Sequence, residues 1–319
     1  MTPLASAVEV AGRVLGELGA RGVVLAPLTT YRVGGPAALL VRPTTVDDLV
    51  KVYEAVHESG LPVLVVGRGS NLLIADEGFA GIAIVLGSSW ADIIIDPVTR
   101  RVVAGAAASL PVLARRTVAA SLSGLEWAVG VPGSVGGGVR MNAGGHGSDI
   151  AASLLTIDLF DLHRGSAVTL PASGLGLRFR GSDLAEHQLV LSAAMQLQVG
   201  EQSRSEVELE EIVRWRREHQ PGGQNAGSVF VNPVPGEVAA GALIDALGLR
   251  GFRIGSAHVS LKHANFIQAD EGARARDVLD VIIAVRTQVA EATGHQLRSE
   301  VRLIGFPEID VEVQAGVKW

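Results

Sequence analysis

Two glycine-rich segments constrain this chain more than any other feature of its sequence. They read VVGRGSNLL at residues 65–73 and GVPGSVGGGVRMNAGG at residues 130–145. Glycine tolerates positive φ and lets the backbone approach a ligand closely, so successive N–H groups can converge on phosphate oxygens. Two such loops indicate a large phosphorylated ligand such as a dinucleotide. Glycine-rich turns without a ligand are the alternative explanation.

Neither segment matches the commonest phosphate-binding motifs. After Gly67 and Gly69, the third glycine position of a Rossmann fingerprint holds Leu72, and no GxxxxGK[ST] sequence occurs. The elements around the loops also lack a regular βαβ alternation. A doubly wound nucleotide-binding sheet is therefore not expected.

The hydrophobic periodicity predicts an α+β chain. Helices are expected over residues 4–19, 45–60, 109–121, 203–220, 237–247 and 274–293. Strands are expected over residues 37–42, 61–67, 81–86, 91–95, 101–105, 152–161, 187–198 and 300–305. Thr45 is a predicted N-cap with Asp48 at the capping-box position, and Ser109 is a second predicted N-cap.

The character of the sequence changes near residue 200, where a charged amphipathic helix begins that Pro221 stops. We place the domain boundary there. A first domain of two α+β lobes covers residues 1–200, a second domain covers 201–306, and 307–319 form a peripheral tail.

Composition excludes several function classes. The chain has no cysteine, which excludes disulfides, thiolate catalysis and iron–sulfur or cysteine-based zinc sites. A formal charge of −6 disfavours nucleic-acid binding. No apolar run approaches a membrane span, and charged residues interrupt the N-terminal apolar stretch, so a cytoplasmic protein without a membrane partner is expected. The eight histidines show no HExxH pattern, and no metal site is predicted.

Several motifs in fixed order resemble the UDP-N-acetylenolpyruvoylglucosamine reductase family over roughly residues 28–305. These motifs are TTYRVGGPA (29–37), GRGSNLL (67–73), GVPGSVGGGVRMNAG (130–144), FRGS (179–182), NAGSVFVNP (225–233), SLKHANFI (260–267) and GHQLRSEVRLIG (294–305). The resemblance implies a flavin-binding domain of the vanillyl-alcohol-oxidase (PCMH) type followed by an α+β substrate-binding domain. It also implies non-covalent FAD, NADPH as hydride donor, and a monomer.

The reaction implied by this resemblance reduces the enolpyruvyl ether of a UDP-sugar to UDP-N-acetylmuramate, a peptidoglycan precursor. Hydride addition to an unsaturated carboxylate builds a dianionic enolate, so the site must neutralise the carboxylate and supply a proton. By motif position, Arg180 matches the carboxylate-binding arginine, Glu300 the acid paired with it, and Ser228 the proton donor.

The resemblance also implies binding residues around these three. The flavin-binding positions are Tyr31, Gly67, Arg68, Gly69, Ser70, Asn71, Leu72, Gly130, Pro132, Gly133, Ser134, Gly136, Gly137, Asn142, Ala143 and Gly144. The substrate-binding positions are Arg217, Asn232, Lys262 and Asn265.

The sequence departs from the family pattern in two places. Phe179 replaces a usual tyrosine, and Val231 replaces a usual lysine. Both tyrosines of the chain, Tyr31 and Tyr53, lie in the first domain, so the tyrosine-bearing lid of the longer subtype is missing. The chain therefore resembles the shorter subtype.

Two alternatives remain open at this level. One is a flavin oxidase of the same fold with another substrate, for which His146 is the only histidine near a glycine loop that could tether the flavin. The other is a non-catalytic protein that binds a nucleotide sugar.

Overall fold

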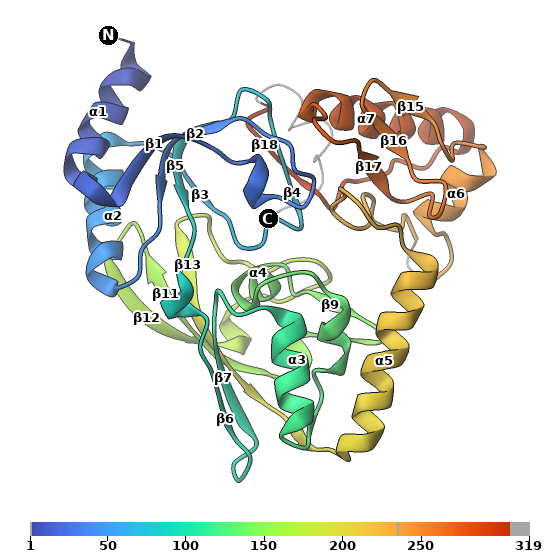
Figure 1. Cartoon of the computed structure of the whole chain (residues 1–319), viewed down its shortest axis with the longest axis horizontal. Helices are drawn as coiled ribbons and strands as arrows, with labels where there is room; N and C mark the ends of the chain where they lie inside the picture. The colour runs from blue at the N-terminus through green and yellow to red at the C-terminus, as the bar shows by residue number, and fades with distance from the viewer. Residues whose placement is uncertain (1, 235, 307–319) are drawn as a thin grey trace.

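The computed structural model describes residues 2–234 and 236–306 of the chain, and four hydrophobic clusters organise them. Two clusters lie in the first lobe of the N-terminal part, one is the core of its second lobe, and one is the core of the C-terminal part. Figure 1 shows these three parts. The predicted tail at 307–319 lies outside the described residues.

The first lobe is a four-stranded sheet with two helices. The strand order is β1 (Gly19–Val24), β2 (Pro36–Val41), β5 (Phe79–Ile84) and β3 (Val63–Val65). Only the β1–β2 pairing is antiparallel. Helices α1 (Pro3–Leu15) and α2 (Val46–Ser59) bury their apolar faces against this sheet. The predicted capping box of Thr45 and Asp48 is present at the start of α2.

The second lobe is a five-stranded antiparallel sheet. Its strand order is β12 (Ser166–Pro171), β11 (Leu154–Asp161), β13 (Gln188–Gln196), β7 (Arg101–Gly105) and β6 (Ile93–Asp96). Its helices are α3 (Leu110–Ala119), the short α4 (Val135–Arg140) and α5 (Gln202–His219). Two small pairings complete it, β8 (Leu122–Ser123) with β14 (Gln198–Val199) and β9 (Gly144–Gly145) with β10 (Ser148–Asp149).

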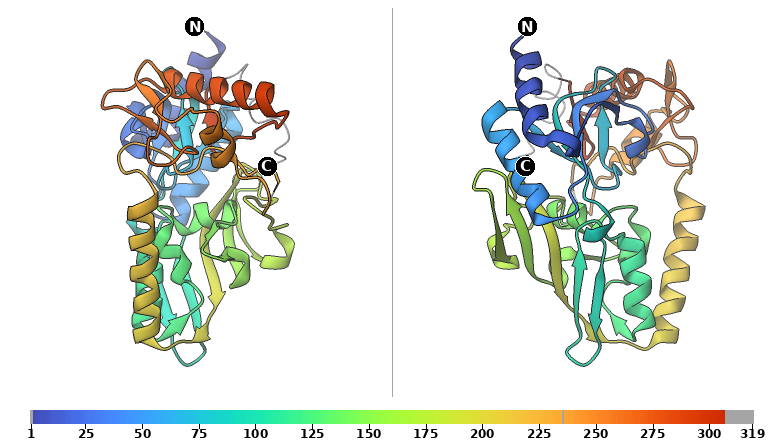
Figure 2. Two further views of the ribbon diagram at one scale, coloured as in Figure 1. Left: turned by 90° about the vertical axis from the view of Figure 1, so that its right-hand side faces the viewer. Right: turned by 60° about the vertical axis from the view of Figure 1, so that its left-hand side comes forward.

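The packing of helix α5 does not follow the domain boundary expected from the sequence. It runs along the outside of the second lobe (Figure 2), and its Leu209 and Ile212 are buried in that lobe's core. By packing, α5 therefore belongs with the residues before it, whereas the boundary expected near residue 200 assigns it to the second domain. Most positions of this helix are polar, so its narrow apolar stripe is hard to recognise in the sequence.

Ser109 also departs from expectation. It occupies the N-cap position of α3, but its side chain makes no capping hydrogen bond. Instead, the N–H of Leu110 donates to the carbonyl of Gly133 at 3.0 Å, and Ser109 forms an isolated bridge with Ser134. The start of α3 is thus tied to the second glycine-rich segment.

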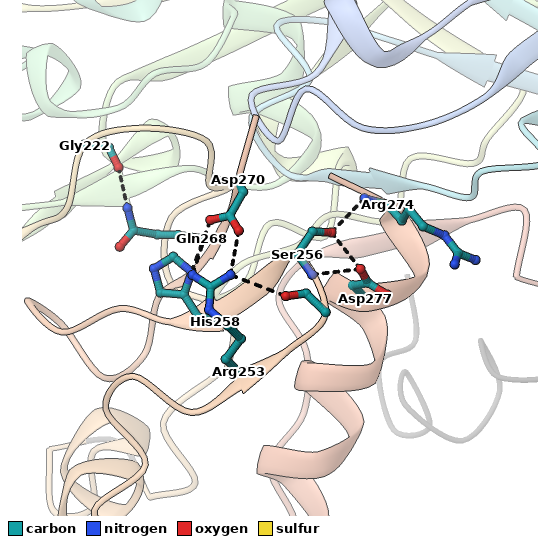
Figure 3. Close-up of polar contacts among 9 residues, drawn as sticks. Gly222, Arg253, Ser256, His258, Gln268, Asp270, Arg274 and Asp277 are labelled. Carbon is teal, nitrogen blue, oxygen red and sulfur yellow. Dashed lines mark hydrogen bonds and ion pairs between the residues drawn. The ribbon is translucent and has the colours of Figure 1, made fainter. Parts of the chain in front are cut away.

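The C-terminal part packs a small sheet against two helices. Strands β15 (Arg253–Ile254), β16 (Ala257–Val259) and β17 (Ile267–Ala269) are antiparallel, and α6 (Ala240–Ala246) and α7 (Ala275–Thr293) complete the core. Figure 3 shows how the β15–β16 turn is held: Ser256 donates from its N–H and Oγ to Asp277 in the first turn of α7, at 2.8 and 2.6 Å. On the same sheet, Arg253 pairs with Asp270 at 2.5 Å.

A seam joins the C-terminal part to the first lobe. The last strand, β18 (Arg302–Ile304), pairs in parallel with β4 (Leu72–Ile74), which directly follows the first glycine loop. Leu73 is fully buried there in the C-terminal core. Asp76 of the first lobe accepts hydrogen bonds from the N–H groups of Ala275 and Arg276 at 2.8 and 3.1 Å, and so caps α7.

The final strand was expected over residues 300–305, but β18 covers only Arg302–Ile304. Residues 298–300 pair with the segment 229–231 instead of with β4, as the N–H of Glu300 donates to the carbonyl of Val229 at 2.7 Å. The predicted α+β class is confirmed.

The seam generates a stability prediction. Leu73→Ala removes a fully buried side chain shared by two parts of the molecule, so we expect it to lower the free energy of unfolding by about 2–5 kcal/mol. Urea denaturation followed by circular dichroism measures this. Val98→Ala, at a side chain that is 89% exposed, is the matched control and should change stability by less than about 0.5 kcal/mol. An equally small change for Leu73→Ala would contradict a packed seam.

Candidate active site

A cavity of about 580 Å³ lies where the two lobes meet the C-terminal part. Both glycine-rich segments line it, together with the last turn of α5, the loop at 225–228 and the start of the final strand segment. Segments far apart in the sequence therefore form one site, with the seam strands β4 and β18 beside it.

The first glycine segment connects β3 to β4 along the cavity. Gly69 has φ +60°, and a Cβ there would lie 2.1 Å from the carbonyl oxygen of Leu28, so only glycine fits. Gly69 is buried, yet no hydrogen bond within the described residues uses its N–H. A Cβ on Gly67 would lie 2.6 Å from Ser134 Oγ, which places the two glycine segments side by side. This cradle, with an unpaired buried N–H, fits a phosphate group.

The second glycine segment folds into α4. Ser134 is its N-cap and accepts a hydrogen bond from the N–H of Gly137 at 3.3 Å. Gly133 and Gly138 pack against Leu110, where an added Cβ would lie 3.3 and 3.2 Å from its methyl carbon. The segment then passes through the β9–β10 hairpin, which forms a further part of the cavity wall.

Arg180 and Glu300 form an ion pair in the cavity wall. Arg180 Nε lies 3.3 Å from Glu300 Oε2 but is not aligned for a hydrogen bond, while Nη1 donates to the carbonyl of Gly144 at 2.9 Å. Arg180 has φ +56°, an unfavourable backbone conformation for a non-glycine residue. The Phe179 ring lies 5.3 Å from the guanidinium carbon and supports it.

Burial raises the pKa of the Glu300 carboxyl, although the Arg180 charge acts in the opposite direction. The neutral acid is therefore favoured to higher pH than for an exposed glutamate. In that form Glu300 is a hydrogen-bond donor toward the cavity.

Ser228 reaches the cavity because Asn265 holds the loop around it. The Asn265 side chain accepts from the N–H of Phe230 at 2.9 Å and donates to its carbonyl at 2.8 Å. The Asn265 carbonyl accepts from the N–H of Val229 at 2.9 Å. Because residues 229–231 also pair with 298–300, Ser228 and Glu300 line the same cavity on adjacent segments.

Most predicted flavin-binding residues line this cavity, and three do not. Tyr31 is fully buried in the C-terminal core, and burial raises the pKa of its hydroxyl. Asn142 is also buried, where it donates to Asp149 at 2.9 Å and accepts from the N–H of Ala151 at 2.9 Å. Gly136 lines a smaller adjoining cavity of about 200 Å³.

None of the four predicted substrate-binding residues lines the cavity. Asn265 braces the Ser228 loop, and Asn232 accepts from the N–H of Ala240 at 3.0 Å at the start of α6. Lys262 donates to the carbonyl of Arg217, which ties the C-terminal part to α5. Arg217 itself faces a different groove between α3 and α5.

Sequence reasoning missed several residues that line the cavity: Arg140, Trp215, Arg216 and Arg302. His146, considered above only as a possible flavin tether, lines it as well. The helical period of α5 could have found Arg216, because the inward face of Ser205, Leu209 and Ile212 continues to residue 216 and not to 217. Arg140 donates to the carbonyls of Leu184, Ala185 and Gln188. Burial and the nearby Arg302 charge lower its pKa to about 10.

Other kinds of site are not found in the part of the chain that the structure describes. There, no three histidine or acidic side chains come together as metal ligands. Every helix between residues 2 and 306 that the structure describes is too short or too polar to cross a lipid bilayer.

Comparisons with known proteins agree with this geometry. A model described as "FAD binding domain" matches residues 37–170, and one described as "UDP-N-acetylenolpyruvoylglucosamine reductase, C-terminal domain" matches residues 219–304. The enzyme of that name from Heliobacterium modesticaldum is 43% identical over 87% of this chain and 88% of its own length. The one from Synechococcus sp. (strain WH7803) is 41% identical over 90% and 94%.

A solved structure points the same way. The crystal structure of UDP-N-acetylenolpyruvylglucosamine reductase from Thermus caldophilus superposes with a TM-score of 0.76 at 34% identity, covering 88% of this chain and 97% of that one. The chain belongs to the UDP-N-acetylenolpyruvoylglucosamine reductase family.

Proposed function

We propose that the protein reduces the enolpyruvyl ether of UDP-N-acetylenolpyruvoylglucosamine to UDP-N-acetylmuramate, with FAD as cofactor and NADPH as electron source. The observation that carries this proposal is the position of Arg180, Glu300 and Ser228 in one cavity. Its other walls are the two glycine segments. Family membership supports the same activity.

The cavity fits a flavin dinucleotide at its glycine-lined side. The unpaired N–H of the buried Gly69 and the close contact of Gly67 with Ser134 form a cradle for phosphate oxygens. We assign FAD binding to these residues and to Ser70, Gly133 and Gly137 beside them. When bound there, the flavin supplies the hydride for the reaction.

Arg180 and Glu300 neutralise the substrate carboxylate in this proposal. With Nη1 on Gly144 and Nε beside Glu300, Nη2 of Arg180 has no hydrogen-bond partner among the described residues. This group can therefore bind a carboxylate oxygen. A neutral Glu300 adds a hydrogen bond to the same group. Together they stabilise the negative charge that develops on the carboxylate during hydride addition.

Ser228 gives its proton to the carbon next to that carboxylate. A serine hydroxyl is a weak acid, but the enolate dianion is a strong base, so proton transfer is favourable. Asn265 fixes the loop through three hydrogen bonds, which supports the precise placement that such a transfer needs.

The two departures from the family pattern fit an active site. Phe179 keeps its ring against the Arg180 guanidinium, and Val231 does not line the cavity. A protein that only binds a nucleotide sugar needs no such arrangement of Arg180, Glu300 and Ser228.

The role of Ser228 generates a kinetic prediction. Ser228→Ala should leave FAD reduction by NADPH unchanged and slow flavin reoxidation by the enolpyruvyl sugar about 10²–10⁴-fold, because only the second half-reaction needs the proton. Anaerobic stopped-flow absorbance at the flavin band separates the two. Ser166→Ala, on an exposed part of β12, is the control and should match wild type. Equal reoxidation rates in Ser228→Ala and wild type would remove Ser228 from the reaction.

The raised pKa of Glu300 generates a pH prediction. The protonated acid is the active form, so the reoxidation rate should be highest at low pH. It should fall as pH rises through a pKa above the usual glutamate value. Glu300→Gln keeps a neutral hydrogen-bond donor that does not titrate. We expect this variant to react more slowly at low pH than wild type and to lose this pH dependence. The same descending limb in Glu300→Gln would assign it to another group.

A further inference from the structure

Arg180 reaches the cavity from a tight turn, residues 178–181, whose backbone is unfavourable for an arginine. The N–H of Arg178 donates to the carbonyl of Gly181 at 3.0 Å, and the N–H of Gly181 donates to the carbonyl of Arg178 at 3.1 Å. Inside this turn Arg180 has φ +56°, a left-handed conformation that glycine or asparagine normally occupies. Such a conformation persists only where the surroundings hold it. The contacts that hold this turn, called the Arg180 turn below, therefore also place the guanidinium.

Ser182 ties the C-terminal side of the Arg180 turn to helix α4. The Ser182 side chain is buried, and its Oγ donates to the carbonyl of Arg140 at 2.7 Å. Arg140 is the last residue of α4, and the carbonyls in the last turn of a helix have no partner within the helix. One hydrogen bond thus satisfies the end of α4 and fixes the residue that directly follows the turn.

Asn142 ties the N-terminal side of the Arg180 turn to the same region. Its Nδ2 donates to the carbonyl of Arg178 at 3.2 Å and to Asp149 Oδ2 at 2.9 Å, and its Oδ1 accepts from the N–H of Ala151 at 2.9 Å. Asn142 is 4% exposed and does not line the cavity. Its own φ is +38°, which asparagine tolerates better than most residues. Protein groups therefore occupy both the donor and the acceptor of this amide.

The same stretch of the second glycine segment, residues 140–144, also holds the Arg180 guanidinium. The carbonyl of Gly144 accepts from Arg180 Nη1 at 2.9 Å, while Arg180 Nε lies 3.3 Å from Glu300 Oε2. Backbone and side chain of Arg180 are thus fixed against one segment. A shift of the turn would move the guanidinium relative to Glu300 and to a bound carboxylate, and such small displacements are costly in catalysis.

We propose that Ser182 and Asn142 are positioning residues for reduction of the enolpyruvyl sugar: they hold the Arg180 turn so that the guanidinium meets the substrate carboxylate. This inference rests on the proposed function. Neither side chain contacts the substrate, because both act through Arg180.

The test compares the two half-reactions of the FAD-loaded protein by anaerobic stopped-flow absorbance. Ser182→Ala removes the hydroxyl donor, and Asn142→Gly removes the side chain but keeps a residue that tolerates positive φ. Each should slow reoxidation of the reduced flavin by the enolpyruvyl sugar about tenfold or more, because the carboxylate-binding group is displaced. Flavin reduction by NADPH, and the flavin absorbance per protein after gel filtration, should match wild type. Ser182→Ala decides the question alone if Asn142→Gly does not fold.

Two control variants remove comparable interactions elsewhere. Ser192→Ala, on β13 and outside the cavity wall, also deletes a hydroxyl that donates one hydrogen bond, to Asp158 Oδ2 at 2.7 Å. Asp183→Asn weakens the exposed ion pair with Arg178 at 2.6 Å, beside the Arg180 turn. An exposed ion pair contributes little, so both controls should reoxidise within about threefold of wild type.

A double-mutant cycle provides a readout that a purely structural role would not give. If Ser182 acts through Arg180, the loss of about tenfold caused by Ser182→Ala in the wild-type background should disappear in an Arg180→Ala background. An equal loss in both backgrounds would show that Ser182 acts independently of Arg180 and would overturn the inference.

The pH profile provides a second such readout. The Arg180 charge lowers the pKa of the Glu300 carboxyl against the effect of burial. A loosened turn weakens this contact, so the pKa should rise and the descending limb of the reoxidation rate should move to higher pH in Ser182→Ala. A move to lower pH would contradict a weakened contact between Arg180 and Glu300.

The outcomes separate this inference from the proposed function. If the sugar reoxidises wild type, Ser182→Ala and Asn142→Gly at equal rates, the positioning roles are overturned while the reductase proposal stands. If both variants lose FAD or react slowly with NADPH, the two residues serve the cofactor site and the inference also fails. If the sugar does not reoxidise wild type, the proposed function fails together with this inference.

Discussion

The site depends on one short stretch of backbone near the C-terminus of the described chain. Residues 298–300 hydrogen-bond to the segment that follows Ser228, and residues 302–304 pair with β4 next to the first glycine loop. Glu300 lies between these two pairings, where its carbonyl also accepts from the Asn71 side chain at 2.9 Å. A single extended segment therefore sets the acid, the serine loop and the flavin cradle in one fixed relation.

The cavity is lined by many positively charged side chains, whereas the whole chain is negatively charged. The chain carries a formal charge of −6, yet Arg140, Arg180, Arg216 and Arg302 all line this cavity. Such a concentration of guanidinium groups suits ligands that bring two phosphates and a carboxylate. Glu300 is the acidic exception: it lies 3.3 Å from Arg180 Nε, and burial raises the pKa of its carboxyl although the Arg180 charge acts in the opposite direction. The electrostatics of the site thus follow from which groups are buried together.

The sequence predicted local structure better than side-chain roles. The Thr45 capping box and the glycine cradle depend on neighbouring residues, so their signatures are visible in the sequence. The substrate-binding roles expected of Asn232 and Asn265 stay predictions. In the structure, Asn232 accepts from the N–H of Ala240, and Asn265 satisfies backbone groups of a segment distant in the chain. A motif identifies such residues without distinguishing contact with a ligand from support of a loop. Arg217 was expected from the sequence, whereas the neighbouring Arg216 lines the cavity and Arg217 faces another groove. The buried face of a helix therefore decides which of two adjacent side chains points into a cavity.

The central claim is that the protein passes a hydride from NADPH to FAD and from FAD to the enolpyruvyl sugar. An anaerobic visible spectrum of the FAD-loaded protein tests it most directly, with NADPH added first and the UDP-enolpyruvyl sugar second. The account predicts that the yellow colour bleaches with NADPH and returns with the sugar in stoichiometric amount. A flavin that bleaches but is not reoxidised by the sugar, or a protein that retains no FAD, would contradict it.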